Sequence, residues 1–402
     1  MPELPSITDL EDQVATLPAE AQARFARLFH VSTTIGTLNP PPSMEPWIEQ
    51  FFGSVAAVRS QKIVKVTNLV TWEGALFNEL RSRRPMEAKS TGDLHKLILE
   101  NVGDPFCKPL EGTPADSFGR VQGAHTITAS NIAKYDGYHG VAIFDEHDPL
   151  AFTAAGVSDA LDTALAWAHK AHAEDERARY FFLMWNCLWK SGASIIHGHA
   201  QMTLTRDMHY AKVEHLRRAA LAYRAQHGTN YFDDLYSVHQ SLGLGFAVEG
   251  TGAEEPRSMG EGEHFYTSAP LHLCTSAQNG VRVLAYLTPI KEKETLILGQ
   301  TLDETLKATI YHVLRTLVDG LGVTSFNLAI YLPPLVLVNG EDWSGFPILV
   351  RIVDRGDPNN KTADIGAMEL YAASVIASDP FRLAETLRWR VVTPHRFWIQ
   401  RV

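Results

Sequence analysis

The chain has 402 residues, of which 45% are hydrophobic and 20% charged, and its formal net charge is −10 at pH 7. The length suggests two or three domains or one large bilobed unit, and the composition is typical of a globular protein. The negative charge argues against a nucleic-acid binder held by phosphate contacts. Three cysteines cannot make a disulfide framework, the acidic N-terminus does not resemble a secretory signal, and no apolar run reaches the roughly 18 residues of a membrane helix. These features favour a cytoplasmic protein without a membrane partner.

Residues 1–60 are predicted to form an N-terminal helical extension. The segment 17–31 carries apolar side chains at helical spacing, and a proline-rich break at 39–43 precedes a second helical pattern at 44–58. The apolar positions of the first helix are Leu17, Ala21, Phe25 and Leu28.

The pattern changes after residue 60 to short strands, and one helix with Ser158 as its expected cap lies between them. The chain then enters a strongly apolar strand, a segment that holds two histidines, and a long amphipathic helix. In chain order the strands are expected at 125–131, 140–145 and 179–186, and the helices at 158–172 and 210–228. A Gly- and Glu-rich connection follows at 244–265.

The second half repeats this order of elements at an offset of roughly 145–150 residues. Strands are expected at 281–289, 294–300, 325–333 and 346–355, and a helix at 301–322 with Thr301 and Glu304 as a capping box. The recurrence is typical of a duplicated αβ unit, although a strand–helix–strand order also recurs in unrelated mixed proteins. The pattern therefore predicts two units, at 61–245 and 246–402.

Two histidines one residue apart stand out in the segment 191–205. On a strand, His197, His199 and Gln201 would share one face, because side chains alternate. A chance H-x-H is nearly expected among 17 histidines, so the pair alone is weak evidence.

The surroundings of the pair add chemistry. Small residues at 191–194 let backbone N–H groups approach an anion closely, and Ser194 adds a hydroxyl. Asn186 ends the preceding apolar strand, where a buried amide needs a partner. Gln201 can donate a hydrogen bond to a phosphate oxygen but does not exchange protons near neutral pH. Together these residues favour a site that holds a phosphoryl group against an imidazole.

The pattern N-x(5)-G-A-S-x-x-H-x-H-x-Q at 186–201 resembles the active-site signature of the galactose-1-phosphate uridylyltransferase family. This family is the transferase branch of the histidine-triad superfamily, which also holds nucleoside-diphosphate-sugar and diadenosine-tetraphosphate phosphorylases. The likeness extends over roughly 61–390, in patches at 67–85, 104–107, 128–139, 144–150 and 364–388. It implies an α+β fold of two histidine-triad-like αβ repeats with antiparallel sheets, which agrees with the duplicated order.

The resemblance implies a role for each residue of the motif. His199 matches the nucleophile, which attacks the α-phosphorus of a nucleotide and holds the nucleotide as a phosphoramidate before a second phosphorylated substrate removes it. Gln201 matches a glutamine where hydrolase members have a third histidine, so it favours transfer over hydrolysis. Ser194 and Asn186 match phosphate and nucleotide contacts, and Asn131 matches a ribose contact.

A zinc site is implied by the same resemblance, with one departure. Its four positions correspond to Asp104, Cys107, His147 and His197, so an aspartate replaces the first cysteine of the family's C-x-x-C pair. Carboxylate oxygen is an accepted zinc ligand, but metal-free members of such families exist, so a zinc site and a decayed site both stay open. The sequence gives no sign of an organic cofactor.

The second half departs most from the uridylyltransferases. The segment 346–356 replaces their histidine–aromatic–proline strand beside the sugar, and its Arg351 and Arg355 either bind a phosphate or are inter-strand arginines. This departure leaves the sugar open, and no residue selects uracil over adenine. A homodimer is expected by analogy with the family alone.

Four functions are therefore weighed. The first is a nucleotidyltransferase of the EC 2.7.7 type, which transfers UMP or AMP between a nucleotide-sugar or dinucleotide and a sugar phosphate or phosphate. This class includes a phosphorylase of ADP-sugars or dinucleoside polyphosphates. The second is a nucleotide hydrolase of the same superfamily, which Gln201 disfavours. The third is a cupin-type metal enzyme, which the missing glutamate at 202–213 disfavours, and the fourth is a non-catalytic nucleotide-binding relative.

Overall fold

The computed structural model describes residues 5–83, 92–249 and 280–392. The connection expected at 244–265 lies largely outside these residues, as do Cys274 and the Arg-Pro pair at 84–85. Within the described ranges, no helix has the length and apolar character that a membrane crossing requires.

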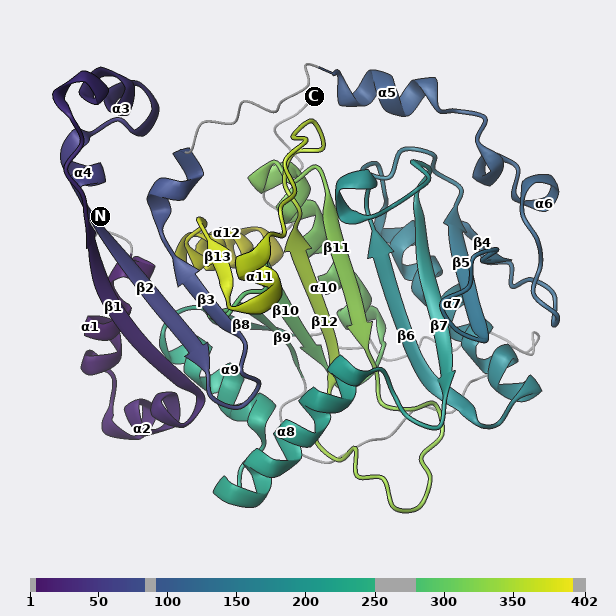
Figure 1. The fold of residues 1–402 in the computed structure, drawn as a ribbon. Helices are drawn as coiled ribbons and strands as arrows, with labels where there is room; N and C mark the ends of the chain where they lie inside the picture. The colour runs from purple at the N-terminus through teal and green to yellow at the C-terminus, as the bar shows by residue number, and fades with distance from the viewer. Residues whose placement is uncertain (1–4, 84–91, 250–279, 393–402) are drawn as a thin grey trace.

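A nine-stranded sheet forms the centre of the described part of the chain, in the order β4-β5-β7-β6-β11-β12-β10-β9-β8 (Figure 1). Every neighbouring pair in it is antiparallel, including β6 and β11, which join the two halves at the middle. The strands of the first half are β4 (Thr126–Ser130), β5 (Tyr138–Phe144), β6 (Ala178–Asn186) and β7 (His199–Arg206). Those of the second half are β8 (Gly245–Glu249), β9 (Gly280–Ala285), β10 (Glu292–Gly299), β11 (Phe326–Tyr331) and β12 (Ile348–Asp354).

The two halves share one topology. The order β4-β5-β7-β6 of the first half corresponds to β9-β10-β12-β11 of the second. In each set of four, a helix lies between the second and third strands in chain order: α7 (Ala154–Glu174) between β5 and β6, and α10 (Glu304–Arg315) between β10 and β11. This arrangement confirms the α+β fold of two antiparallel repeats.

The caps of these two helices differ from the sequence-based expectation. Thr153 rather than Ser158 caps α7, because the helix begins five residues earlier and the Thr153 hydroxyl accepts from the N–H of Gly156. Asp303 caps α10 by accepting from the N–H of Leu306, and the Thr301 hydroxyl donates to the Asp303 carboxylate instead of capping the helix itself.

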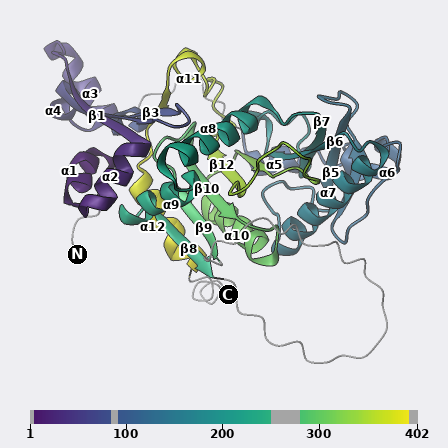
Figure 2. The same cartoon turned by 90° about the horizontal axis from the view of Figure 1, so that it is seen from below.

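Helices α7 and α10 cover one face of the sheet, and α8 (Ala211–His227) lies on the other, as the view from below shows (Figure 2). A Cβ added at Gly140 would meet both the Trp167 ring of α7 and the Met202 side chain, so Met202 points toward α7. Because side chains alternate along a strand, its neighbour Gln201 points to the opposite, α8 face. The motif residues therefore lie on the face that α7 and α10 leave open.

A separate four-stranded sheet lies beside the second half, in the order β1-β2-β3-β13. Its strands are β1 (Phe29–Thr37), β2 (Ser60–Asn68), β3 (Gly74–Phe77) and β13 (Ser374–Ile376). The expectation that 1–60 is helical therefore misses β1, which is rich in β-branched residues and pairs with β2 along its whole length. The parallel pairing of β13 with β3 ties the end of the second half to this sheet.

Short helices complete the described structure. Those before the large sheet are α1 (Leu10–Thr16), α2 (Ala19–Leu28), α3 (Glu45–Phe52), α4 (Val55–Arg59), α5 (Leu94–Glu100) and α6 (Pro109–Gly112). Those after α8 and α10 are α9 (Tyr231–Ser241), α11 (Ala367–Tyr371) and α12 (Pro380–Val392).

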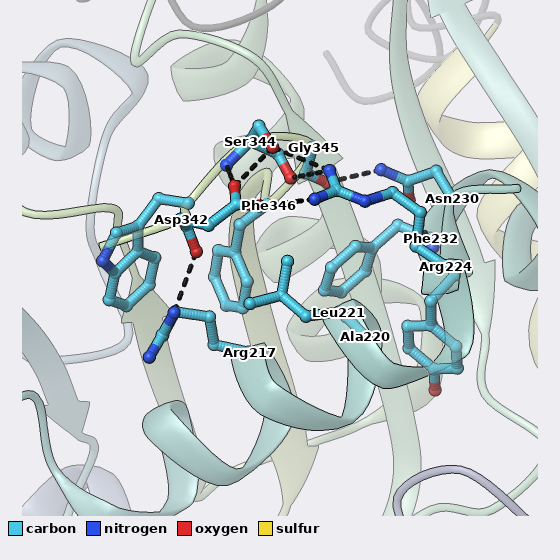
Figure 3. A pocket seen from close by; sticks show the side chains of 12 residues that line it. Arg217, Ala220, Leu221, Arg224, Asn230, Phe232, Asp342, Ser344, Gly345 and Phe346 are labelled. Atoms are coloured by element: carbon cyan, nitrogen blue, oxygen red, sulfur yellow. Dashed lines mark hydrogen bonds and ion pairs between the residues drawn. The ribbon is translucent and has the colours of Figure 1, made fainter. Parts of the chain in front are cut away.

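The α8 helix is attached to the loop that follows β11 (Figure 3). Arg224 donates to the Asp342 carboxylate and to the Ser344 hydroxyl, and Arg217 donates to the Asp342 carbonyl while its guanidinium lies over the Trp343 ring. The cavity between helix and loop has a volume of about 10 Å³, which holds at most one water molecule. It is a packing seam between the repeats and is too small for a ligand.

Candidate active site

The histidine motif spans a long turn, residues 187–198, between the central strand β6 and its neighbour β7. The backbone carbonyls of Cys187 and Leu188 accept from the Ser191 hydroxyl. Gly192 has φ +100°, a conformation that glycine adopts without strain. Gly198 is confined, because an added Cβ would lie 3.0 Å from both the Glu146 carbonyl oxygen and the Phe144 ring. The turn therefore brings His199 to the first position of β7, against β5.

His199 is held as a neutral imidazole. Its Nδ1 lies 2.7 Å from the carbonyl oxygen of His197, so Nδ1 carries the proton and donates, and Nε2 keeps its lone pair. The side chain is 5% exposed, and this burial lowers the pKa of His199, which keeps the ring uncharged near neutral pH. The Phe106 ring contacts it edge-on, with 5.1 Å between ring centroids. Nε2 has no protein partner among the described residues.

Gln201 follows on the same face of β7, and its orientation is determined by its neighbours. Its Oε1 lies 3.0 Å from Nε2 of His139 on β5 and 3.5 Å from the amide nitrogen of Asn131. The amide nitrogen of Gln201 has no protein partner in the described ranges. The expected ribose residue Asn131 thus lies beside the expected phosphate residue Gln201.

Asn186 is oriented from the second repeat. Arg355 can only donate, and it donates to Oδ1 of Asn327. The amide nitrogen of Asn327 therefore donates to Oδ1 of Asn186, at 2.6 Å, and to the Ser191 carbonyl, at 2.9 Å. Since its oxygen is occupied, Asn186 presents its amide nitrogen to the site, as Gln201 does. The arrangement offers N–H donors, which suits an anionic ligand such as a phosphate.

The four residues expected as metal ligands come together. One ligand atom from each of Asp104, Cys107, His147 and His197 lies within 4.8 Å of the other three. The Cys107 sulfur is 3.3 Å from Nδ1 of His147 and 3.4 Å from Nδ1 of His197, and the two Nδ1 atoms are 3.2 Å apart. A tetrahedral zinc with bonds of about 2.0–2.3 Å places its ligands about 3.3–3.8 Å apart. The spacing therefore fits a zinc-sized ion.

The protonation of this group also fits a metal. Nε2 of His147 faces the Ile98 carbonyl at 3.0 Å, and Nε2 of His197 faces the Phe144 carbonyl at 2.8 Å, so both rings turn their Nδ1 lone pairs inward. One oxygen of Asp104 accepts from two backbone N–H groups, and the other is buried without a partner in the described structure. A buried, unpartnered carboxylate oxygen beside two lone pairs and a thiol is what a bound cation would satisfy.

The remaining expected residues lie outside this cluster. Ser194 is exposed in the turn. Arg351, whose side chain is 12% exposed, is paired with Glu73 and Glu294, both at 2.7 Å. Arg351 on β12 and Gln201 on β7 are linked through paired residues on β11 and β6, so three strand spacings separate them. At nearly 5 Å for each spacing, the two residues are about 14 Å apart.

Arg355 also has a carboxylate partner in this chain, since it forms a bidentate ion pair with Asp364. It reaches the site only through Asn327.

Two residues of the site were not singled out from the sequence, His139 and Asn327. His139 ends the segment 128–139 that carries the family likeness, but only the register of β5 against β7 brings it to Gln201. Asn327 faces Asn186 only because β11 pairs with β6 across the repeats. Neither pairing has a signal in local sequence.

Comparison with known proteins defines the fold. No protein-family model matches the chain, and no curated protein sequence matches it. Among solved structures, it is similar to an ADP-glucose phosphorylase from Arabidopsis thaliana with bound ADP-glucose, with a TM-score of 0.53 and 14% identity over 80% of this chain and 97% of that one. A galt-like protein from the same plant gives a TM-score of 0.50 and 14% identity over 79% of this chain and 96% of the other. At this identity the likeness establishes a shared fold.

Proposed function

We propose that this protein, which has the fold of an ADP-glucose phosphorylase and a galt-like protein, is a nucleotidyltransferase. It passes a nucleoside monophosphate, UMP or AMP, between two phosphorylated small molecules through a covalent nucleotidyl-His199 intermediate. The observation that carries the proposal is the His199 ring, whose Nδ1 is bonded to the His197 carbonyl so that Nε2 keeps its lone pair and has no protein partner among the described residues.

The first half-reaction forms a phosphorus–nitrogen bond. The Nε2 lone pair of His199 attacks the α-phosphorus, and the bond from that phosphorus to the leaving phosphate oxygen breaks, with its electron pair leaving on that oxygen. The His197 carbonyl stabilises the positive charge that develops on the ring, because it accepts from Nδ1–H. In this proposal the amide nitrogens of Gln201 and Asn186 donate to the phosphoryl oxygens.

The second half-reaction regenerates the free histidine. A phosphate oxygen of the acceptor attacks the phosphorus, and the phosphorus–nitrogen bond breaks back to neutral imidazole. Gln201 cannot act as a base toward water, which supports transfer over hydrolysis. The fold shared with an ADP-glucose phosphorylase supports inorganic phosphate as one acceptor, and a sugar phosphate is the other. Ser194 and Asn131 are proposed as further contacts of the nucleotide.

Zinc is proposed as the ion for Asp104, Cys107, His147 and His197. When bound, it would crosslink three chain segments and hold the His197 backbone, whose carbonyl orients the nucleophile. We propose that residues 61–245 form the catalytic unit and that residues 246–402 form a second unit that supports it. The protein is proposed to be cytoplasmic.

The test is covalent labelling without an acceptor. The protein is incubated with UDP-sugars, ADP-sugars and dinucleoside polyphosphates labelled at the α-phosphate, and the protein is then examined for acid-labile, base-stable label. Wild type should become labelled by at least one of them, and His199→Ala should lower the labelling by at least about 10³-fold, the scale of loss of a nucleophile. Adding inorganic phosphate or a sugar phosphate should then release the label as nucleotide product.

His30→Ala is the matched control, because His30 is exposed on β1 in the separate sheet and should keep wild-type labelling. Label that persists in His199→Ala would refute the intermediate. A wild type that no nucleotide labels would favour the non-catalytic binding protein.

A further inference from the structure

His139 is a buried histidine that the reaction outlined above does not use. It is 0% exposed on β5, and the Tyr135 ring stacks on it with 4.4 Å between centroids and 26° between planes. Its Nε2 lies 3.0 Å from Oε1 of Gln201, on the strand beside it. A fully buried imidazole needs a partner for each nitrogen, and the identity of these partners determines its tautomer.

The tautomer follows from a backbone group. The N–H of Tyr135 points at Nδ1 of His139, 2.9 Å away, and a backbone N–H can only donate. Nδ1 therefore accepts and carries no proton, so in the neutral ring the proton is on Nε2. Burial lowers the pKa of His139, and the nearby Lys134 lowers it further, which agrees with a neutral ring. Nε2–H must then donate to Gln201.

The orientation of Gln201 follows in turn. Only its oxygen can accept from His139, and a reversed amide would place its NH₂ group against the Nε2–H donor. Asn131 agrees with this orientation. The Ala133 N–H donates to its Oδ1, and its amide nitrogen lies 3.2 Å from Nε2 of His139 and 3.5 Å from Oε1 of Gln201, so Oε1 is the acceptor within reach of both nitrogens. The amide nitrogen of Gln201 is consequently the group left for a ligand.

We propose that His139 is a positioning residue that sets the Gln201 amide so that its N–H, and not its oxygen, meets the α-phosphate of the nucleotide. This inference rests on the proposed function, since it assigns the donor that stabilises the phosphoryl group during attack by His199. With a reversed amide, the site would present an oxygen lone pair to an anion, and the donor would be lost.

Two substitutions separate this role from a structural one. A glutamine at this position reaches the place of Nε2 with an amide donor, whereas an asparagine reaches only the place of Nδ1. His139→Gln should label within about threefold of the wild-type rate at saturating nucleotide. His139→Asn should label about 10- to 100-fold more slowly, somewhat less than the loss of a direct oxyanion donor, with little change in the nucleotide concentration at half-saturation. Equal losses in the two variants would overturn the proposal.

A double-mutant cycle tests whether His139 acts through Gln201. In a Gln201→Ala background, His139→Asn should lower the labelling rate no further, because the group that it orients is absent. A further 10-fold loss in that background would overturn the proposal.

A measurement without turnover separates the two proposals. Nitrogen-15 spectra of histidine-labelled protein near neutral pH should place His139 in the neutral Nε2–H tautomer, and an Nδ1–H tautomer or a charged ring would overturn the positioning role even if His199 becomes labelled. A wild type that forms no nucleotidyl enzyme would refute the proposed function, and the tautomer would still decide how Gln201 is oriented.

Discussion

His239 shows at the scale of one residue how burial determines a charge state. It is 0% exposed, its Nδ1–H donates to the Leu235 carbonyl at 2.8 Å, and its Nε2 accepts from the Leu287 N–H at 3.2 Å. Burial lowers its pKa from 6.5 to about 4. A proton added to Nε2 would remove the second bond and leave a charge in the core.

Acid should therefore destabilise the fold through His239. The unfolded chain takes up its proton near pH 6.5 and the folded chain near pH 4, so the stabilisation is complete above pH 6.5 and is lost as the pH falls toward 4. Between pH 7 and pH 5 this one group should cost about 2 kcal/mol. Urea unfolding at several pH values measures the slope, which should be smaller in His239→Gln. His209, whose pKa is also lowered to about 4, leaves some slope in that variant.

His95→Gln is the matched control. His95 is exposed on α5, so its removal should leave the pH dependence of the unfolding free energy unchanged. The assignment to His239 fails if wild type and His239→Gln lose the same free energy between pH 7 and pH 5.

At the scale of elements, the metal-ligand group connects the segment after α5 to the turn before β7. Cys107→Ser should abolish stoichiometric zinc and lower the melting temperature by several degrees, because three segments lose a common crosslink. Elemental analysis of the purified protein and thermal melts measure the two effects independently of activity. Cys187→Ala should keep its zinc, since this buried cysteine lies outside the group. Zinc retained by Cys107→Ser, or absent from wild type, would contradict the assignment.

The elements that the sequence predicts well are those with a strong local pattern. The strands around β6 and β7 and the helices α7, α8 and α10 lie where their apolar periodicity indicates. β1 was missed because it is half-exposed along most of its length, so its alternation is weak. The caps at Thr153 and Asp303 depend on where the helix packs, and several nearby hydroxyls and carboxylates could have served.

The site was predictable to the extent that it is local in sequence. Asn186 ends β6, and His199 and Gln201 lie at the start of β7, so one short stretch of chain carries all three residues. The partners that orient them, His139 and Asn327, come from strand pairings over long sequence separations. Register of this kind is a property of the assembled sheet, so a single sequence does not reveal it.

At the scale of the whole molecule, Arg351 joins the two sheets. It donates to Glu73, the residue before β3 in the small sheet, and to Glu294 on β10 in the large one. The side chain of Glu294 is 0% exposed, and this burial raises its pKa while Arg351 opposes the rise. Arg351, Glu73 and Glu294 form a triad of one cation and two carboxylates at the contact between the two sheets.

Arg351→Met should therefore lower the unfolding free energy by about 3–5 kcal/mol, the usual cost of leaving buried charges without a partner. Chemical denaturation measures this value. The double variant Arg351→Met/Glu294→Leu should recover most of the loss, because it removes the fully buried carboxylate as well. A single variant within 1 kcal/mol of wild type would show that the triad does not hold the sheets together.

The pairing of β6 with β11, which joins the two halves of the large sheet, determines how the molecule behaves on dilution. Two separate subunits that met along such a strand pair would part when their concentration fell below the dissociation constant. Here one chain carries both strands, so each half stays in the presence of the other at a high effective concentration. The Asn327 side chain that orients Asn186 therefore stays beside it at any protein concentration.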